Sequence, residues 1–479
     1  MKTLSRTQLA LLLQIITSAA LIEQLTLTNA FAATAQQKEP PTLSLKRFIQ
    51  QASLNDITFE SILIDQLPLQ YKRDTLLPDS DIFMDVKYQH NFYLDQDRDK
   101  PEASLSLSKL FPYNGTELSL SYARSSSVSS NAEDAGLSFS ISQAIANNAF
   151  GKATRMLDKI IGLENDISRY QIVEAYEDYL ASLTLAYYNW YSAYENLRVG
   201  QSSLRSSQKL MDNILERQRQ NIALPIDVNK MKLLLIGKQE NIIVLEQVYH
   251  TYANLIFKAI GHQGAAAYVP VKPAAPTAEI AFDNEYQAFT QGSRTYRMLN
   301  MLQQQGKLAV EKAADELLPS TRLLLGYTLQ GQDWALQDQQ DNLYAAFNFS
   351  LPIGNRISKA KKQLAEIELR KTRLANTNKY KELQINLKNL FLQIQHQQQL
   401  IAVSNKKIKL AEDILEDEAE NYSFGKVTLN DYIAAVNNLD ENRFSHTAHS
   451  VQLNKLLIEW LRLTDQLVSE NVLSSTQKP

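Results

Sequence analysis

Alternation of apolar and polar residues marks two regions of the chain as strand-rich. Four runs between positions 82 and 145 repeat with a period of two, and two more follow between positions 320 and 353. A period of two predicts β-strands. Asn114-Gly115, between the second and third runs, is a strong two-residue hairpin signal. We therefore expect strands over about 82–145 and about 320–353.

In several of these runs leucine alternates with serine, so the polar partner is small and uncharged. Leu105 and Leu107 lie on either side of Ser106, and Leu118 and Leu120 follow the same pattern around a serine. Apolar residues outside and small polar residues inside, in runs of about 9–11 residues, are the weak signature of membrane-barrel strands. The pattern favours a membrane barrel and leaves a soluble sheet as the alternative.

Long stretches with three-and-four spacing of apolar residues follow each strand region. They predict long helices over 148–220 and 356–420, with returning helices over 226–260 and 429–467. Another helix is expected over 284–317, before the second strand region. At 1.5 Å per residue, a helix of roughly 70 residues is about 100 Å long, far beyond the three or four turns of an ordinary globular helix.

Each long helix meets its returning helix at a short tip. In the second tip, residues 421–431, Gly425 suits the left-handed end of a helix, and Thr428 with Asp431 has capping-box spacing. In the first tip, residues 219–227, Asn221 takes the place of the glycine and Pro225 occupies the first helical position. The two tips predict an internal duplication, with repeats over 33–263 and 284–468 joined by a linker over 264–283.

Composition and the chain ends narrow the class of protein. A formal charge of −3 and a pI near 6.2 argue against a nucleic-acid binder, and the absence of cysteine excludes disulfides and thiolate metal sites. Residues 1–32 read as a signal peptide, with basic residues, an apolar run and Ala30-Phe31-Ala32 as the cleavage site. Residues 469–479 are expected to form a disordered tail. Nucleotide, hydrolase and zinc-protease motifs are missing, so we expect no enzyme activity, cofactor or metal.

Four to six strands cannot close a membrane barrel, whose smallest examples have about eight, so several copies would have to share one. The order of elements, the duplication and the two tips resemble the TolC family of outer-membrane efflux proteins over nearly the whole mature chain. The resemblance implies an α+β fold: a long antiparallel α-helical barrel continuous with a transmembrane β-barrel, shared by a homotrimer with duplicated helix-strand-helix halves. The family barrel has twelve strands, four from each subunit.

The resemblance also implies a role and partners. The protein would be the outer-membrane channel of a tripartite efflux pump or a type I secretion system in a Gram-negative bacterium. It would be a passive duct that contacts outer-membrane lipid and extends into the periplasm. A periplasmic membrane-fusion adaptor and an inner-membrane RND, ABC or MFS transporter would recruit it. The alternatives are a periplasmic coiled-coil adaptor or scaffold protein and an exported enzyme.

The resemblance carries candidate site residues onto the two tips. Asp227, Tyr422 and Asp431 match the family's periplasmic gate or constriction. The arginine of the family latch is replaced by Val427, beside Lys426. Capping of helices is the simpler role for the two aspartates. The expected adaptor-docking residues, which would otherwise be ordinary loop positions, are Asn221, Ile222, Ala223, Leu224, Phe424, Gly425, Lys426 and Val427.

The number of strands departs from the family pattern. Six alternating runs are present where the family uses four. Either the hairpin over 105–122 is an insertion outside the barrel wall, or the barrel is larger. The sequence interpretation favours twelve strands with an extra hairpin.

Overall fold

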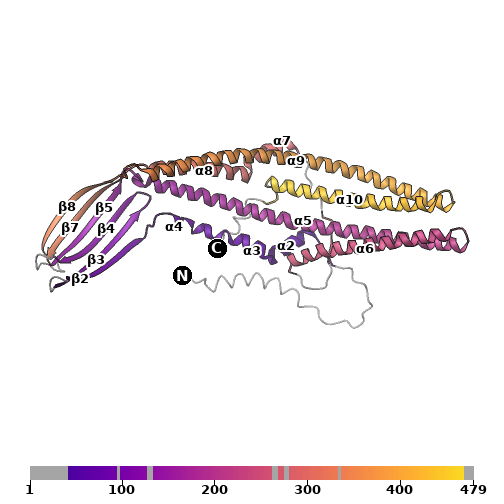
Figure 1. The fold of residues 1–479 in the computed structure, drawn as a ribbon, viewed down its shortest axis with the longest axis horizontal. Helices are drawn as coiled ribbons and strands as arrows, with labels where there is room; N and C mark the ends of the chain where they lie inside the picture. Colours follow the sequence, from indigo (N-terminus) through magenta and orange to yellow (C-terminus); the bar gives the residue numbers. More distant parts are fainter. Residues whose placement is uncertain are drawn as a thin grey trace, which may run out of the picture. The chain divides into compact units, whose positions relative to one another are not determined.

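The computed structural model describes residues 41–93, 98–126, 133–261, 268–273, 280–332 and 336–468 (Figure 1). The predicted signal peptide, the predicted tail and much of the predicted linker lie outside these residues. The chain divides into two compact units: a small one of Met1–Thr42 with Ala265–Val269, and a large one of Leu43–Gly264 with Pro270–Pro479. In the small unit, the Val269 amide donates to the Pro41 carbonyl at 3.0 Å. The long helices and the main sheet belong to the large unit.

The main sheet contains six antiparallel strands in the order β2-β3-β4-β5-β7-β8. The alternating runs therefore form strands, as predicted. Four of these strands come from the first half of the chain and two from the second. Their bounds are β2 Ile82–Tyr93, β3 Arg98–Phe111, β4 Thr116–Ser126, β5 Glu133–Ala144, β7 Ser320–Gln332 and β8 Gln337–Ser350.

The hairpin of β3 and β4 is an integral part of this sheet, whereas the sequence interpretation favoured an extra hairpin outside the barrel wall. β3 pairs with β2 on one side and with β4 on the other, and β4 pairs with β5. The predicted Asn114-Gly115 turn does connect the two strands, with Gly115 in the left-handed region at φ 65°. Alternation identifies a strand but does not say which strands lie beside it.

The long helices have nearly the predicted bounds. α5 spans Lys152–Arg219 and returns as α6, Pro225–Ala259, while α9 spans Arg356–Ser423 and returns as α10, Leu429–Leu463. The helix predicted over 284–317 is α7, Phe282–Gly292, followed by α8, Arg294–Asp315. The two separate at Ser293, whose hydroxyl accepts a hydrogen bond from the Tyr296 amide at 3.2 Å and so caps α8.

Shorter elements complete the described chain. Among the described residues, none of the helices is both long and apolar enough to cross a bilayer. The shorter elements are β1 Thr42–Leu43, α2 Leu45–Asn55, α3 Ile57–Ile64, η1 Leu67–Gln70, α4 Lys72–Leu76, η2 Ala149–Gly151 and β6 Val269–Pro270.

Within the large unit the sheet lies at one end of α5 and α9, and the two tips lie at the other end (Figure 1). α5 packs against α6, α8 and α10, and α9 packs against α8 and α10. α6 and α9 therefore stand at the two edges of the helical layer, just as β2 and β8 stand at the two edges of the sheet. Near the tips, one apolar cluster joins α5, α6 and α10.

Candidate functional site

The first tip connects α5 to α6 through residues 220–224. Asn221 has the left-handed conformation expected of it, with φ 58°. Pro225 occupies the first position of α6, where its missing N–H costs nothing. The Leu224 amide donates to the Asp227 carboxylate at 3.3 Å. Because the Leu224 side chain has no oxygen, the first tip carries only one half of a capping box.

The second tip, between α9 and α10, carries both halves. Gly425 has φ 71°, and the Lys426 amide donates to the Asn421 carbonyl at 2.9 Å, which closes the last turn of α9. The Thr428 amide donates to the Asp431 carboxylate at 3.0 Å, and the Asp431 amide donates to the Thr428 hydroxyl oxygen at 3.4 Å. The predicted capping box is therefore confirmed.

Asp431 is fully exposed, and its carboxylate also accepts a hydrogen bond from the Thr428 hydroxyl at 2.6 Å. This hydroxyl and the Thr428 amide favour the ionised carboxylate, so they lower the pKa of Asp431 below its ordinary value. Its exposure leaves the charge open to the space around the tip, while the hydrogen bonds keep it ionised.

The two tips pack against each other through the apolar cluster. Tyr422, at the end of α9, and Tyr432, at the start of α10, have ring centroids 5.8 Å apart. Both rings cover a buried core made by the first tip, the ends of its helices and Leu429 of α10. The buried members of the cluster are Leu210, Met211, Ile214, Ala223, Val228, Met231, Leu235 and Leu429.

Arg217, in the last turn of α5, is a site residue that the sequence interpretation missed. Its guanidinium lies 5.0 Å from the centroid of the Tyr422 ring. Its Nη1 donates to the carbonyl oxygens of Tyr422 at 3.4 Å and Ser423 at 3.2 Å. These carbonyls are at the C-terminal end of α9, where a helix carries partial negative charge and lacks internal donors. Arg217 therefore joins the first tip to the second by a cation–π contact and two hydrogen bonds.

Three of the tip residues influence one another electrostatically. Burial raises the pKa of the Tyr422 hydroxyl, the nearby Arg217 charge lowers it, and the Asp227 charge raises it. Asp227 therefore lies near enough for its charge to act on the Tyr422 hydroxyl, and Arg217 acts on the same group. The Asp431 side chain is hydrogen-bonded to Thr428 on its own turn, and among the described residues it has no hydrogen bond to Arg217, Tyr422 or Asp227.

Most of the expected docking residues lie at the surface of the tips. The largest exposed apolar side chains among them are Ile222, Leu224 and Phe424, each more than half exposed. The Lys426 ammonium lies 5.2 Å from the centroid of the Phe424 ring. Asn221 and Gly425 are exposed and Val427 is half-buried. Ala223 is buried in the apolar cluster, so it supports the tip from inside.

Further along the helices from the tips, three polar side chains form a buried group that we call the collar: Ser203, Lys238 and Asp440. The Lys238 ammonium lies 2.7 Å from the Asp440 carboxylate, and the Ser203 hydroxyl donates to the same oxygen. The collar ties together α5, α6 and α10. Beside it, α6 and α10 line an open groove of about 510 Å³, with Leu233, Leu234, Lys238 and Ile433 among its residues.

Comparison with solved structures identifies known proteins that have the same fold as this chain. No protein-family sequence profile matches the chain, and no curated protein matches it in sequence. Solved structures do match. The outer membrane protein VceC of Vibrio cholerae has a TM-score of 0.65 at 13% identity, covering 88% of this chain and 95% of its own.

Two further channels match in the same way. The outer-membrane channel CmeC of Campylobacter jejuni has a TM-score of 0.64 at 13% identity, covering 94% of this chain and 96% of its own. The open state of the MtrE outer-membrane channel of Neisseria gonorrhoeae has a TM-score of 0.63 at 12% identity, covering 88% and 89%. The chain therefore has the fold of the TolC family of outer-membrane channels.

Proposed function

We propose that the protein is an outer-membrane channel: a passive duct that runs from the periplasm to the exterior of a Gram-negative cell. The observation that carries this proposal is the chemistry of the two faces of the sheet. The fold shared with outer-membrane channels supports it.

The strand registers align apolar residues across all six strands. One row across the sheet contains Met84, Leu107, Leu120, Phe139, Tyr327 and Leu343. The adjacent row, which points to the other face, contains Asp85, Ser106, Ser121, Ser138, Thr328 and Asn342. A soluble sheet buries its apolar face against another layer. Here large apolar side chains such as Leu343 are exposed, and lipid is the solvent that suits them.

The edges of both layers require further copies of the chain. Within the described part of the chain, β2 and β8 each have one side without a strand neighbour, and unpaired backbone groups cannot remain unpaired in lipid. Two helices also expose apolar stripes with a repeat close to seven residues. Those of α9 include Ile367, Leu374, Val403 and Leu410, and those of α6 include Ile226, Leu233, Ile236 and Ile243. A second copy would cover a stripe and an edge at once, which supports a closed homotrimer.

The tips supply the periplasmic end of the duct. In a trimer, Asp431 would form a ring of three exposed carboxylates, which favours cations over anions. Arg217, Tyr422 and Asp227 would hold the closed state. The exposed apolar residues Ile222, Leu224 and Phe424 would dock a periplasmic adaptor. An RND, ABC or MFS transporter of the inner membrane would supply the energy for efflux or type I secretion.

The test is to express the full chain and ask whether it becomes a channel in the envelope. We expect it in the outer-membrane fraction, extracted by detergent as a trimer that resists SDS until heated, and conducting ions in planar bilayers. Val403→Asp with Leu410→Asp places charges on the α9 stripe and should reduce the trimer to monomer. Gln398→Asp is the control, because Gln398 is exposed but lies five residues before Val403 and thus roughly 140° away around the helix.

A wild-type chain that stays monomeric and water-soluble without detergent would overturn the proposal. That result would favour a periplasmic scaffold instead.

A further inference from the structure

The β3–β4 hairpin shares the chemistry of its neighbours on both faces. In the apolar row, Leu107 and Leu120 lie between Met84 of β2 and Phe139 of β5. On the other face, Ser106 and Ser121 lie between Asp85 and Ser138. The hairpin therefore continues both the lipid-facing band and the polar lining. If the sheet lies in the membrane, as the proposed function requires, β3 and β4 lie there too.

The turn of this hairpin is fastened to the beginning of α5. A Cβ atom on Gly151 would lie 2.1 Å from the Tyr113 carbonyl oxygen, and one on Gly115 would lie 2.9 Å from the Gly151 amide nitrogen. Only glycine permits so close an approach of two backbones. Arg155 of α5 also donates to the Tyr113 carbonyl at 2.6 Å. The turn between β3 and β4 thus packs against the residues where α5 begins.

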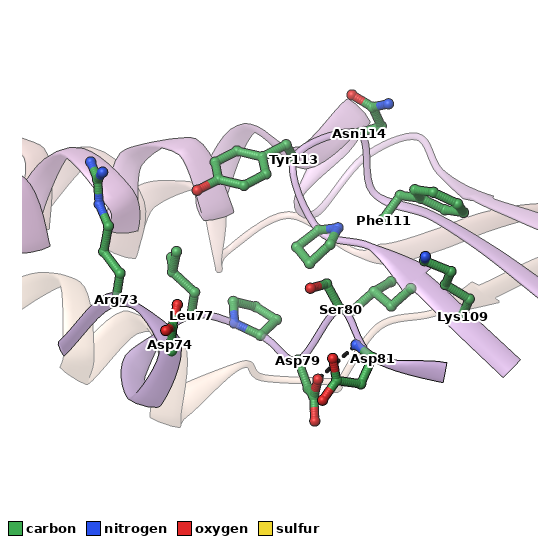
Figure 2. A pocket seen from close by; sticks show the side chains of 13 residues that line it. Arg73, Asp74, Leu77, Asp79, Ser80, Asp81, Lys109, Phe111, Tyr113 and Asn114 are labelled. Atoms are coloured by element: carbon green, nitrogen blue, oxygen red, sulfur yellow. Dashed lines mark hydrogen bonds between the residues drawn. The ribbon is translucent and has the colours of Figure 1, made fainter. Parts of the chain in front are cut away.

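The surroundings of the turn support the same placement. Phe111, Tyr113 and Asn114 of the turn line a cavity of about 710 Å³ together with Arg73 and Leu77, and Figure 2 shows the Tyr113 ring directed toward the side where Arg73 and Leu77 lie. The turn therefore lies beside the end of α4, on the side of the sheet where the helices begin. A hairpin that projected away from the wall would not have this packing.

We propose that the barrel wall contains six strands from each subunit, so that a trimer forms a barrel of eighteen strands, with β8 of one copy pairing with β2 of the next. Neighbouring strands in the sheet are antiparallel, so β2 and β8, five steps apart, run in opposite directions. Closure between copies is then antiparallel as well. This inference rests on the proposed function and specifies the exit of its duct.

The consequence is a wide exit. Barrel diameter grows roughly linearly with strand number, so eighteen strands give about one and a half times the diameter of twelve. Barrels of about 16–18 strands leave an aqueous channel. The polar row, with Ser106, Ser121 and Ser138, lines this exit with short side chains. The outer-membrane portion would therefore pass bulkier polar cargo than a twelve-stranded exit would.

Disulfide mapping tests the strand count directly, because the chain has no native cysteine. The variant pairing Leu107→Cys with Leu120→Cys is the positive control, since these residues are register partners. Met84→Cys with Phe139→Cys reports a four-stranded wall. With six strands these residues are three strand spacings, roughly 14 Å, apart, beyond the roughly 7 Å limit between bridged Cα atoms. Met84→Cys combined in turn with Cys at Leu343, Ala345 or Phe347 reports closure between copies.

In oxidised outer membranes we expect the control to cross-link within one chain and Met84–Phe139 to give no product. At least one of the three closure pairs should give covalent dimers and trimers and nothing larger. An intrachain Met84–Phe139 product would overturn the inference and restore a four-stranded wall. So would an intact oligomer without any closure product, or one that closes as a dimer or tetramer.

A cysteine-free parent that never enters the outer membrane would instead defeat the proposed function. The fractionation of the parent is therefore scored before any cross-link. In membrane-inserted trimers, Cys at Leu107 should resist a membrane-impermeant maleimide and Cys at Ser106 should react. Cys at Phe139 and Ser138 of β5 are the matched controls. Equal reaction of Leu107→Cys and Ser106→Cys, with the β5 controls behaving as expected, would overturn the inference alone.

Discussion

The tips and the collar are neighbouring regions of the same helices, but they are fastened in different ways. The tips are joined by Arg217, which is half-buried. Its guanidinium lies against the face of the Tyr422 ring and donates hydrogen bonds to two backbone carbonyls of α9. The collar is joined by a buried ion pair between Lys238 and Asp440, with side chains 14% and 10% exposed. Ionic contacts at exposed sites contribute little to the free energy of folding. A buried charge that has lost its partner lowers that free energy strongly.

This difference locates where the helical layer can open. Movement that separates Arg217 from the end of α9 loses a few modest interactions that water can partly replace. Movement that separates Lys238 from Asp440 leaves the buried Asp440 carboxylate without its cation. We therefore expect the tips to open while the collar stays closed, and the following changes test that expectation in order of decreasing effect.

Lys238→Met should have the largest effect, because it leaves the Asp440 carboxylate buried without a cation. Breaking a buried pair in this way costs about 3–5 kcal/mol. Hydrogen exchange of the α10 amides near Asp440 should show that loss in the free energy of local opening. The double variant Lys238→Met with Asp440→Leu should recover most of it. Unchanged exchange in the single variant would mean that the collar does not hold these helices.

Arg217→Gln should have the next largest effect, confined to the tips. It removes the cation–π contact with Tyr422 and weakens the bonds to the last α9 carbonyls, together about 1–2 kcal/mol. The ratio of open to closed channels in a planar bilayer should then rise roughly 5- to 30-fold. Arg219→Gln is the matched control, since Arg219 pairs with Glu216 on its own exposed helix turn and, among the described residues, does not reach the second tip. Equal gating in both variants would contradict the role of Arg217.

Gly425→Ala should destabilise the second tip by about 1–2 kcal/mol, the cost of a side chain in the left-handed region. No atom lies within 4 Å of the added Cβ, so backbone strain alone is measured. Exchange of amides in the last turn of α9 should quicken. Gly237→Ala, in the interior of α6 and equally open, should slow exchange instead, because alanine favours the helix. If Gly425→Ala and Gly237→Ala changed the exchange rates in the same direction, backbone strain in the left-handed region would not explain the effect at Gly425.

The pH response of the second tip should be the smallest effect. Hydrogen bonds from Thr428 lower the pKa of Asp431, so its contribution is present above the ordinary Asp pKa and is lost as pH falls through the lowered value. The local opening free energy at the start of α10, obtained from exchange after correction for the intrinsic pH dependence of the exchange rate, should therefore be constant from neutrality to pH 5 and should fall only in stronger acid. Asp431→Asn should abolish that acid response, and a response that persists would assign it to another group.

The sequence predicted those features that depend on local pattern. Alternation located all six strands, and three-and-four spacing located the four long helices to within a few residues. Cap chemistry located both tips, because the φ values of Asn221 and Gly425 follow from residue type. The break at Ser293 was missed, since a single serine within a periodic stretch does not by itself end a helix.

Features that depend on distant parts of the chain were not predictable in the same way. Arg217 acts on carbonyls about two hundred residues away, and only the packing of α5 against the second tip reveals the contact. A basic residue in the last turn of a helix is a general hint, but Arg219 provides the same hint without the same role. The placement of the β3–β4 hairpin likewise required knowledge of its neighbours.

The uncovered sides of β2 and β8 also bear on how the protein reaches its destination. A strand with a free backbone edge and large apolar side chains on both faces, such as Phe83 and Met84, is a template for uncontrolled pairing. During transit a single subunit is therefore at risk of aggregation, and the risk grows with its concentration. If the protein is an outer-membrane channel, as proposed, its delivery requires either a chaperone that shields the edge or insertion that keeps pace with synthesis. Slowing assembly should convert the protein into insoluble material before it unfolds any helix.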